Sequence, residues 1–374
     1  MYQKEIKEGN ENKIFKYIFN TEDSFSIPDL AKINDMSFPT VKRVINKFLE
    51  KAIVKEWTLS SGGVGRRAIE YKYNSEFCYS IGVRINEEKI RIILIDAKGK
   101  KLIYKTYDYR NENKDILDIL INKLKTFLAE LDNKFLEKII GIGISIPGIF
   151  NKENSFLEFT LAKRHPASSI KKIEEELNLE VWVENEANMS ILAEAIIGNN
   201  RELTDFTVIN ISNNVTCSTF HKFGTTNDEY FFKASRVHHM IVDYEQQKKV
   251  GDCISYKVLL EKVKKAFPEI NSLKDFFENK KFKDSSEGKE IISEYLTYMG
   301  IILKNLLFTY NPRKLIICGE ISNYEEFLLE DILNIVYEEN HNFYRGRETI
   351  KFSKFKGDSS ILGAAIFPLV DKLM

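Results

Sequence analysis

The sequence of 374 residues predicts an α/β protein with a small helical domain at its N-terminus and two strand-rich lobes behind it. Three observations support this fold class. A basic amphipathic helix ends near residue 50, apolar strands alternate with helices from about residue 76, and a second strand-and-helix unit opens near residue 206. Two such lobes have the outline of an actin-like, ribonuclease-H-like pair. We therefore expect domains at 1–75, 76–198 and 199–374, with a C-terminal helix that can return to the first lobe.

The segment Ser37–Leu49 has the pattern of a recognition helix. Its apolar residues recur at i, i+3, i+4, i+7 and i+8, so one face can be buried, while the other face is basic. Ser37 can cap the helix, and Pro39 fits in a first turn, where backbone N–H groups lack partners. The segment Ser26–Ile33 predicts a shorter helix, and Asn34–Met36 joins the two as a helix-turn-helix. An ordinary helical hairpin with a solvated lysine face is the alternative.

A predicted β-hairpin wing follows this helix. Ile53–Leu59 and Ala68–Tyr73 have strand composition, and the glycine-rich turn between them carries Arg66 and Arg67 at its tip. The span 40–72 holds eight basic and three acidic residues, in a chain with 55 of each sign. This local charge predicts DNA binding. The residues expected at DNA are Ser37, Thr40, Lys42, Arg43, Asn46, Lys47, Arg66 and Arg67.

We expect these side chains to contact different parts of the DNA. Thr40, Lys42 and Arg43 would approach base edges, and Lys47 would meet phosphate. The wing arginines would reach an adjacent minor groove. A dimer would place two recognition helices one turn or a multiple of it apart, so a palindromic double-stranded operator is expected.

Strands and helices alternate through both lobes. In the first lobe we expect strands at Tyr79–Val83, Ile90–Asp96, Ile139–Ile146 and Val181–Glu184, and helices at Ile116–Leu131 and Asn185–Ile197. In the second lobe we expect strands at Phe206–Ile211 and Leu315–Gly319, a long helix at Ile291–Phe308, and a last helix from Ser359. The near-continuous apolar runs are typical of strands buried on both faces.

The cysteines and the hydropathy of the sequence exclude several classes of protein. The four cysteines include no CxxC pair, which argues against a disulfide framework or a zinc ribbon. No apolar run approaches membrane-spanning length, and the first residues do not form a secretory signal. We therefore expect a cytoplasmic protein that does not bind a membrane.

Several strings, taken in order, resemble a known family. Gly65–Arg67 stands where its regulators carry Gly-Arg-Pro, Gly141–Gly148 is similar to its first-lobe strand and turn, and Glu184–Asn188 resembles its Asn-Asp-Ala-Asn sugar-site motif. Val237–Asp243 resembles its Glu-x-Gly-His-Met stretch, and Leu362–Ala365 its C-terminal helix. This is the ROK family, which contains sugar-responsive repressors, such as those of the xylose and N-acetylglucosamine type, and sugar kinases. The resemblance implies a homodimeric, or dimer-of-dimers, regulator of carbohydrate-related genes.

The chain departs from the family's kinase motifs. Family kinases hold ATP phosphates with an early Asp-x-Gly-Gly-Thr turn, but here Gly82-Val83 is followed by Arg84–Glu88. The second glycine-rich loop is replaced by Ser212–Thr219, and a nucleotide-side Gly-Gly pair is reduced to Gly319 before Glu320. Glycine is needed in such loops because a Cβ keeps backbone N–H groups away from phosphate. We expect no catalytic residues, no cofactor and no enzyme activity.

The family's zinc segment is also replaced. Its Cys-x-Cys-Gly-x-x-Gly-Cys stretch should follow Asp243, where this chain carries one cysteine, Cys253. With His239 that makes two ligands, whereas a structural zinc site needs four. We therefore expect no metal.

The sugar site is partly kept. Asn185 and His239 match the family, Glu186 replaces the aspartate that acts as general base, and Arg236 stands where a sugar-binding glutamate is expected. These four residues are the candidate ligand-binding set. A guanidinium pairs best with phosphate or carboxylate, so any effector sugar is expected to be acidic rather than neutral. Three alternatives remain: a vestigial cleft, a sugar kinase with an added DNA-binding domain, and a ligand-independent DNA-binding protein.

Overall fold

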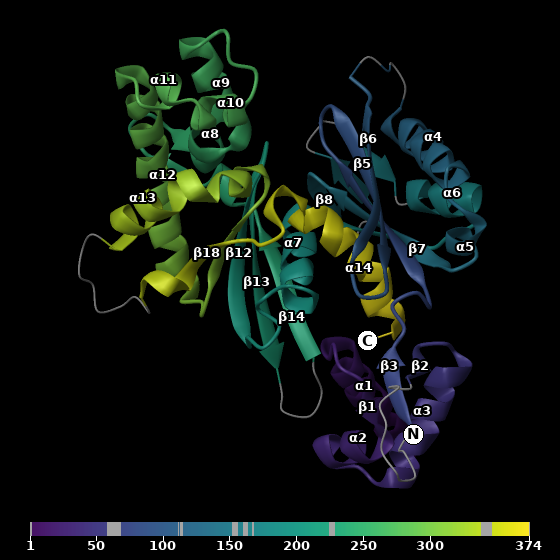
Figure 1. The fold of residues 1–374 in the computed structure, drawn as a ribbon. Helices are drawn as coiled ribbons and strands as arrows, with labels where there is room; N and C mark the ends of the chain where they lie inside the picture. The colour runs from purple at the N-terminus through teal and green to yellow at the C-terminus, as the bar shows by residue number, and fades with distance from the viewer. Residues whose placement is uncertain are drawn as a thin grey trace.

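The computed structural model describes residues 2–57, 69–110, 112, 115–151, 156–159, 164–166, 168–223, 229–337 and 346–373. A small N-terminal domain sits below two lobes that lie side by side (Figure 1). Each lobe is built on a five-stranded mixed sheet, and the helices pack against the sheets. The predicted α/β class is confirmed.

The N-terminal domain combines three helices with a small sheet. The helices are α1 (Tyr2–Asn20), α2 (Ile27–Asn34) and α3 (Phe38–Glu50), and the strands, in the order β1-β3-β2, are β1 (Phe25–Ser26), β2 (Val54–Trp57) and β3 (Glu70–Tyr73). The predicted cap at Ser37 forms, and Ser26 caps α2 in the same way: each hydroxyl accepts a hydrogen bond from a backbone N–H three residues on, at 3.3 Å. Asp35 takes a left-handed φ of 52° in the turn between α2 and α3.

Two details of this domain differ from the expectation. Strand β2 begins at Val54, one residue later than predicted, and β3 begins at Glu70, so Ile69 lies outside the strand. The tip of the wing, with Arg66 and Arg67, lies outside the described residues.

The two lobes repeat one topology. In the first sheet the order is β11-β7-β4-β5-β6, with strands β4 (Tyr79–Ile85), β5 (Lys89–Asp96), β6 (Lys101–Asp108), β7 (Ile139–Ile146) and β11 (Val181–Asn185). In the second the order is β14-β13-β12-β17-β18, with β12 (Asp205–Ile211), β13 (Val215–Phe223), β14 (Glu229–Ser235), β17 (Leu315–Cys318) and β18 (Ile350–Phe352). Each sheet is an antiparallel three-stranded meander extended by two parallel strands.

Helices complete each lobe. The first lobe carries α4 (Ile116–Ala129), α5 (Asn133–Leu136), α6 (Ser168–Leu177) and a short sheet of β8 (Gly148–Asn151), β9 (Phe156–Phe159) and β10 (Arg164–Pro166). The second carries a hairpin of β15 (Ile241–Asp243) and β16 (Lys248–Lys249), and the helices α8 (Val250–Ile254), α9 (Tyr256–Ala266), α10 (Leu273–Glu278), α11 (Lys280–Lys283), α12 (Ser286–Tyr310) and α13 (Glu325–Tyr337). By length and composition α12 could cross a membrane, but its residues Met299, Leu303 and Leu306 are buried in the core of the second lobe.

Helices α7 (Glu186–Ile196) and α14 (Ser359–Leu373) run between the lobes (Figure 1). Small residues let α14 lie almost directly on the first sheet. A Cβ on Gly143 of β7 would stand 1.8 Å from the carbonyl oxygen of Ala364, and one on Gly363 would stand 1.7 Å from the carbonyl oxygen of Met189 in α7. The chain therefore needs glycine at both contacts.

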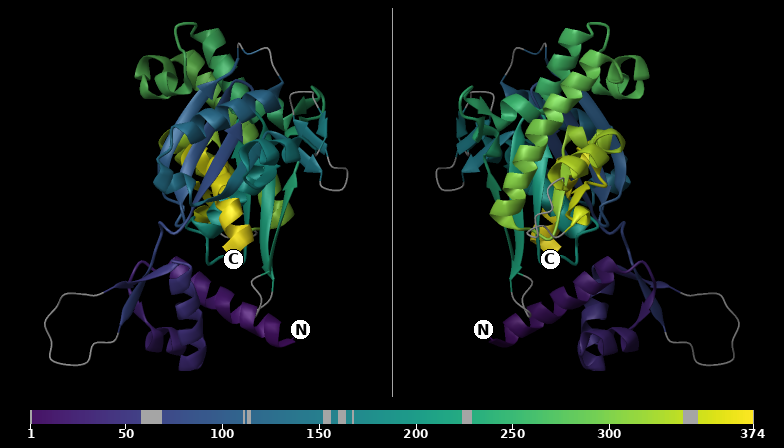
Figure 2. Two further views of the ribbon diagram at one scale, coloured as in Figure 1. Left: turned by 90° about the vertical axis from the view of Figure 1, so that its right-hand side faces the viewer. Right: turned by 90° about the vertical axis from the view of Figure 1, so that its left-hand side faces the viewer.

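The N-terminal domain shares its core with the first lobe. One cluster of buried side chains joins Phe15 and Tyr73 to Ile95 of β5 and Leu369 of α14. The hydroxyl of Tyr73 donates to the carbonyl of Ala97 at 3.0 Å. The turn after β5 completes the contact, since the Lys98 ammonium donates to the carbonyl of Thr21 at 2.9 Å and lies over the rings of Phe19 and Tyr73. Two further views show this contact at the base of the lobes (Figure 2).

We predict that Gly143→Ala lowers the free energy of unfolding by about 3 kcal/mol or more, because its methyl group would overlap backbone that cannot move aside. Urea denaturation measures the change. Gly9→Ala is the matched control: no atom lies within 4 Å of its added Cβ, and alanine favours a helix, so this variant should be neutral or slightly more stable. Equal stability of the two variants would contradict the packing of α14.

Candidate functional site

The exposed face of α3 is polar and cationic. Val41, Val44, Ile45 and Phe48 are buried, and the opposite face forms a shallow groove lined by Pro39, Lys42, Arg43, Asn46, Lys47 and Glu50. Lys42, Arg43 and Asn46 are exposed to solvent. A helix with a buried seam and a cationic outer face can enter the major groove of DNA.

Three of the residues predicted for DNA contact already have partners. The Ser37 and Thr40 hydroxyls lie 2.8 Å apart and form a hydrogen bond at the start of α3. Lys47 forms an ion pair with Glu11 of α1. A DNA phosphate that binds Lys47 therefore has to share its ammonium group with Glu11 or displace the Glu11 carboxylate. The structure thus brings together the six residues predicted on or beside α3, from Ser37 to Lys47.

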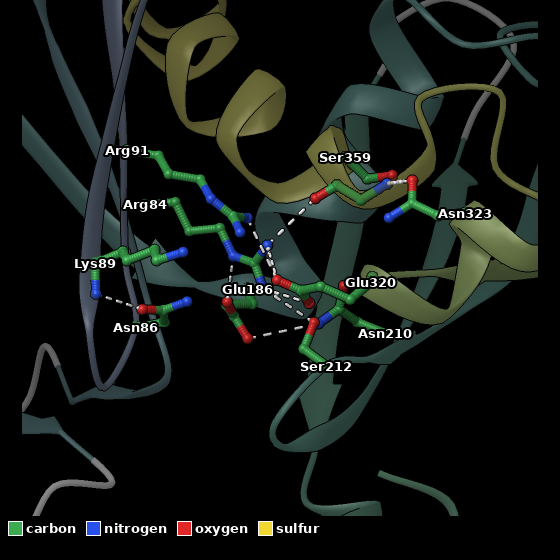
Figure 3. A network of polar contacts seen from close by, with 12 residues as sticks. Arg84, Asn86, Lys89, Arg91, Glu186, Asn210, Ser212, Glu320, Asn323 and Ser359 are labelled. Atoms are coloured by element: carbon green, nitrogen blue, oxygen red, sulfur yellow. Dashed lines mark hydrogen bonds and ion pairs between the residues drawn. The ribbon is translucent and has the colours of Figure 1, made fainter. Parts of the chain in front are cut away.

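A second polar group lies where the two lobes meet. Arg84 comes near the end of β4, Glu186 follows β11, Ser212 follows β12, and Glu320 follows β17 after one residue. All four positions are at the carboxyl ends of strands, where open α/β sheets bind their ligands. Here these positions bind one another (Figure 3).

The Arg84 guanidinium donates four hydrogen bonds. Nε donates to Glu186 at 2.7 Å, and Nη2 donates to Glu320 at 2.9 Å and to the hydroxyl of Ser212 at 3.0 Å. Nη1 donates to the carbonyl of Gly357 at 3.2 Å and also forms an ion pair with the other oxygen of Glu320 at 2.7 Å. Four of the five N–H donors of the rigid guanidinium plane therefore form hydrogen bonds. Arg91 of β5 adds a contact to Glu320 at 3.3 Å. We call Arg84, Arg91, Glu186, Ser212 and Glu320 the Arg84 cluster.

The Arg84 cluster is buried and balanced in charge. The side chains of Arg84 and Glu186 are 2% and 3% exposed, and two arginines face two carboxylates. Burial opposes the charge on Arg84, but the carboxylates outweigh it and raise the pKa of the guanidinium above its usual range. Burial also acts to raise the pKa of Glu320, yet Arg84 outweighs it and holds that pKa at about 2. For Glu186 burial prevails, and its pKa is raised.

Little room is left beside the cluster. The cavity lined by Arg84, Asn86, Glu87, Pro147, Glu186, Ser212, Asn213, Asn214 and Glu320 leaves about 10 Å³ for the centre of a water-sized sphere. That is about the space one water molecule needs. In this arrangement of the lobes the position has no room for a phosphate or a sugar beside Arg84.

The candidate sugar residues divide into two groups. Asn185 and Glu186 lie together at the start of α7, where the Asn185 side chain accepts a hydrogen bond from the N–H of Asn188 at 2.9 Å and so caps the helix. Arg236 precedes a short 3-10 helix of the second lobe, Val237–His239, and His239 is its last residue; both side chains are exposed. Within the described residues no hydrogen bond or ion pair joins the two groups.

His238, next to His239, was not among the residues predicted from the sequence. Its side chain has a structural role. Its Nδ1 accepts from the N–H of Val215 at 3.3 Å, and its ring packs so closely on Gly251 that a Cβ there would lie 2.0 Å away. Where the family has its zinc segment, Lys248 instead donates to the hydroxyl of Tyr298 at 2.9 Å. Among the described residues no group of three or more His, Cys, Asp or Glu side chains is placed to hold a metal ion.

Comparison with known proteins shows which family this chain is similar to. Residues 80–216, which include most of the first lobe and the start of the second, match the model of the ROK family. The chain carries a ROK family domain. Among curated proteins it is similar to the xylose repressor of Bacillus spizizenii, at 24% identity over 87% of this chain and 86% of that protein. It is also similar to the DNA-binding transcriptional repressor Mlc of Escherichia coli strain K12, at 21% identity over 97% and 93%.

Solved structures give the same fold. A ROK family transcriptional regulator, described as a homologue of the Escherichia coli Mlc protein, matches with a TM-score of 0.76 and 19% identity over 98% of both chains. A ROK family glucokinase from Streptomyces griseus, solved with glucose and AMPPNP, matches with a TM-score of 0.63 and 18% identity over 77% of this chain and 98% of that chain. The ROK domain is thus a fold that also occurs in sugar kinases.

The Arg84 cluster gives a physical meaning to two departures from the kinase motifs. Arg84 begins the segment that stands in place of the glycine turn, and Glu320 takes the place of the second glycine after β17. In the structure these two replacements contact each other. Sequence reasoning noted the lost glycines but not the new pair. The available signal was Arg84 itself, because a lone arginine in an apolar strand requires a buried partner.

We predict that Arg84→Met lowers the free energy of unfolding by about 3–5 kcal/mol, because it leaves Glu186 buried without a cation and Glu320 with Arg91 alone. Urea denaturation measures this change. Arg110→Met is the matched control, since Arg110 pairs with Asp108 on the surface, where solvent screens the pair, and its loss should change stability little. Adding Glu186→Gln and Glu320→Gln to Arg84→Met should recover part of the loss. A small effect of Arg84→Met would contradict the assigned burial.

Proposed function

We propose that the chain is a DNA-binding transcriptional regulator of carbohydrate-related genes, acting as a cytoplasmic repressor, with a ROK domain that does not phosphorylate sugars. The observation that carries this proposal is the exposed cationic face of α3 within a helix-turn-helix. The shared core between that domain and the first lobe supports a joint role. The names of the curated relatives, a xylose repressor and Mlc, support the same reading.

DNA contact follows from the geometry of α3. Thr40, Lys42 and Arg43 would approach base edges, with Arg43 free to form a bidentate contact with guanine. Lys47 would exchange its contact with Glu11 for a phosphate, and Ser37 and Asn46 would donate to the backbone. Arg66 and Arg67 are proposed to enter the neighbouring minor groove. A homodimer would present two α3 helices to the half-sites of a palindromic operator.

The absence of kinase activity is proposed from the Arg84 cluster. Phosphoryl transfer depends on donors and a metal ion placed around the γ-phosphate. At this position the chain has its own guanidinium, and Glu186, the family's general-base position, is bound to it. The alternative is a sugar kinase with an added DNA-binding domain. Hexose- or pentose-dependent turnover of ATP that is lost in Glu186→Ala would favour that alternative.

A second candidate is a regulator that needs no small ligand, and the Arg84 cluster favours it as well. Ligands commonly act on two-lobed proteins by drawing the lobes together. In this chain Arg84 of the first lobe already binds Ser212 and Glu320 of the second. An effector can add to this only by binding elsewhere between the lobes or by displacing Arg84.

We predict that Arg43→Ala weakens binding to a specific site by about 1–3 kcal/mol, because a bidentate base contact is lost. The site is obtained by selection from random duplexes, and fluorescence anisotropy measures the affinity. Lys47→Ala should instead weaken all sequences alike and flatten the salt dependence, because it removes a phosphate contact. Arg110→Ala, an exposed arginine of the first lobe, is the control. Full affinity in a protein without residues 1–75 would refute the assignment.

The effector is the next point to test. If a sugar binds through Asn185, Glu186, Arg236 and His239, we expect an acidic or phosphorylated sugar, because the exposed Arg236 brings a positive charge that a neutral sugar does not need. Calorimetry with glucose and glucose 6-phosphate compares the two classes, and Arg236→Ala should abolish the preference. Stronger binding of glucose would contradict the charge argument. No binding by a panel of both classes would support the ligand-independent candidate.

A further inference from the structure

The first residue of α3 is an exposed aromatic side chain. Phe38 is 48% exposed, lies outside the hydrophobic core clusters, and makes no ring contact with the described residues. Single exposed apolar residues are common on protein surfaces and need no explanation by themselves. What distinguishes Phe38 is its place, because the N-terminal residues of a recognition helix are the ones that reach base edges.

Phe38 lies in line with the polar residues proposed to contact DNA. Phe38, Lys42 and Asn46 are spaced at i, i+4 and i+8, so their side chains follow one stripe of the helix. Lys42 and Asn46 are exposed and line the groove on that face. A helix that lays this stripe in the major groove therefore also brings the Phe38 ring against the base pairs.

The surroundings indicate what covers the ring. Lys42 and Arg43 are exposed one turn after Phe38 and outnumber the exposed Asp35 before it, and this positive charge suits the phosphates on either side of a groove rather than an apolar protein surface. Within the major groove the one apolar group at a base edge is the C5-methyl of thymine. An aromatic ring offers it contact area and cannot accept the hydrogen bonds that cytosine or adenine donate there.

We propose that Phe38 is a specificity-determining residue that packs on the C5-methyl group of a thymine in each half-site. This inference rests on the proposed DNA-binding function. It adds an apolar contact to the hydrogen-bonding ones assigned to Thr40, Lys42 and Arg43. It also assigns a role to Phe38, which neither the apolar periodicity of α3 nor its charge predicted to contact DNA.

The test uses the full chain and duplexes selected from a random pool. Each thymine of the selected site is replaced in turn by deoxyuridine, which removes only the methyl group. Replacement at one position of the half-site should weaken binding of the unchanged protein about fourfold, the change expected for one buried methyl group. Phe38→Ala should bind the thymine site about as weakly and lose the difference between thymine and deoxyuridine at that position. Phe38→Leu should keep part of it.

Two controls separate the outcomes. Phe231→Ala removes a phenylalanine of similar exposure, 52%, in β14 and should leave the methyl effect unchanged. Thermal unfolding checks that Phe38→Ala is folded, as expected for an exposed position. A site without a methyl-sensitive thymine, or a methyl effect that survives in Phe38→Ala, would overturn the inference while leaving DNA binding intact. Failure to enrich any sequence would overturn the proposed function and the inference together.

Discussion

A buried guanidinium fixes how the two lobes of this protein meet. Removing an arginine from water costs several kcal/mol, and only full hydrogen bonding and opposite charge can offset that cost. Arg84 meets this requirement with contacts from four separate places: the start of α7, the ends of β12 and β17, and the turn before α14. Since each contact must keep its geometry, the carboxyl ends of both sheets are held in one arrangement.

The rest of the molecule extends from this point. Helix α7 begins at Glu186, and α14 begins two residues after Gly357, so both helices between the lobes start at the Arg84 cluster. Glycines let α14 lie against β4, β7 and α7. Its far end contributes Leu369 to the core that holds Phe15 and Tyr73 of the N-terminal domain. One helix thus runs from the junction of the lobes to the N-terminal domain (Figure 1).

Much of this fold could be predicted from the sequence because its signals are local. Apolar runs located β7 and β12 to within a residue at either end, and the hydroxyls of Ser26 and Ser37 marked the starts of α2 and α3. The candidate site was harder to predict from the sequence. Arg84 and its partner Glu320 are 236 residues apart, and no periodicity links them. The missing glycines led us to expect no phosphate binding, but only the folded chain shows which side chains lie together at those positions. The ion pair between Lys47 and Glu11 could not be predicted either, because no periodicity links these two distant positions.

The mutual dependence of Arg84 and Glu320 also limits how the sequence can change. Replacing Arg84 alone leaves Glu186 without a cation and Glu320 with Arg91 only, and replacing Glu320 alone leaves two arginines facing one carboxylate. Either single step is therefore destabilising. A change that removes the guanidinium without this cost requires coordinated substitution of its carboxylate partners. Related chains that carry an arginine at position 84 should carry a carboxylate at position 320 as well, so the two positions are expected to vary together as an epistatic pair.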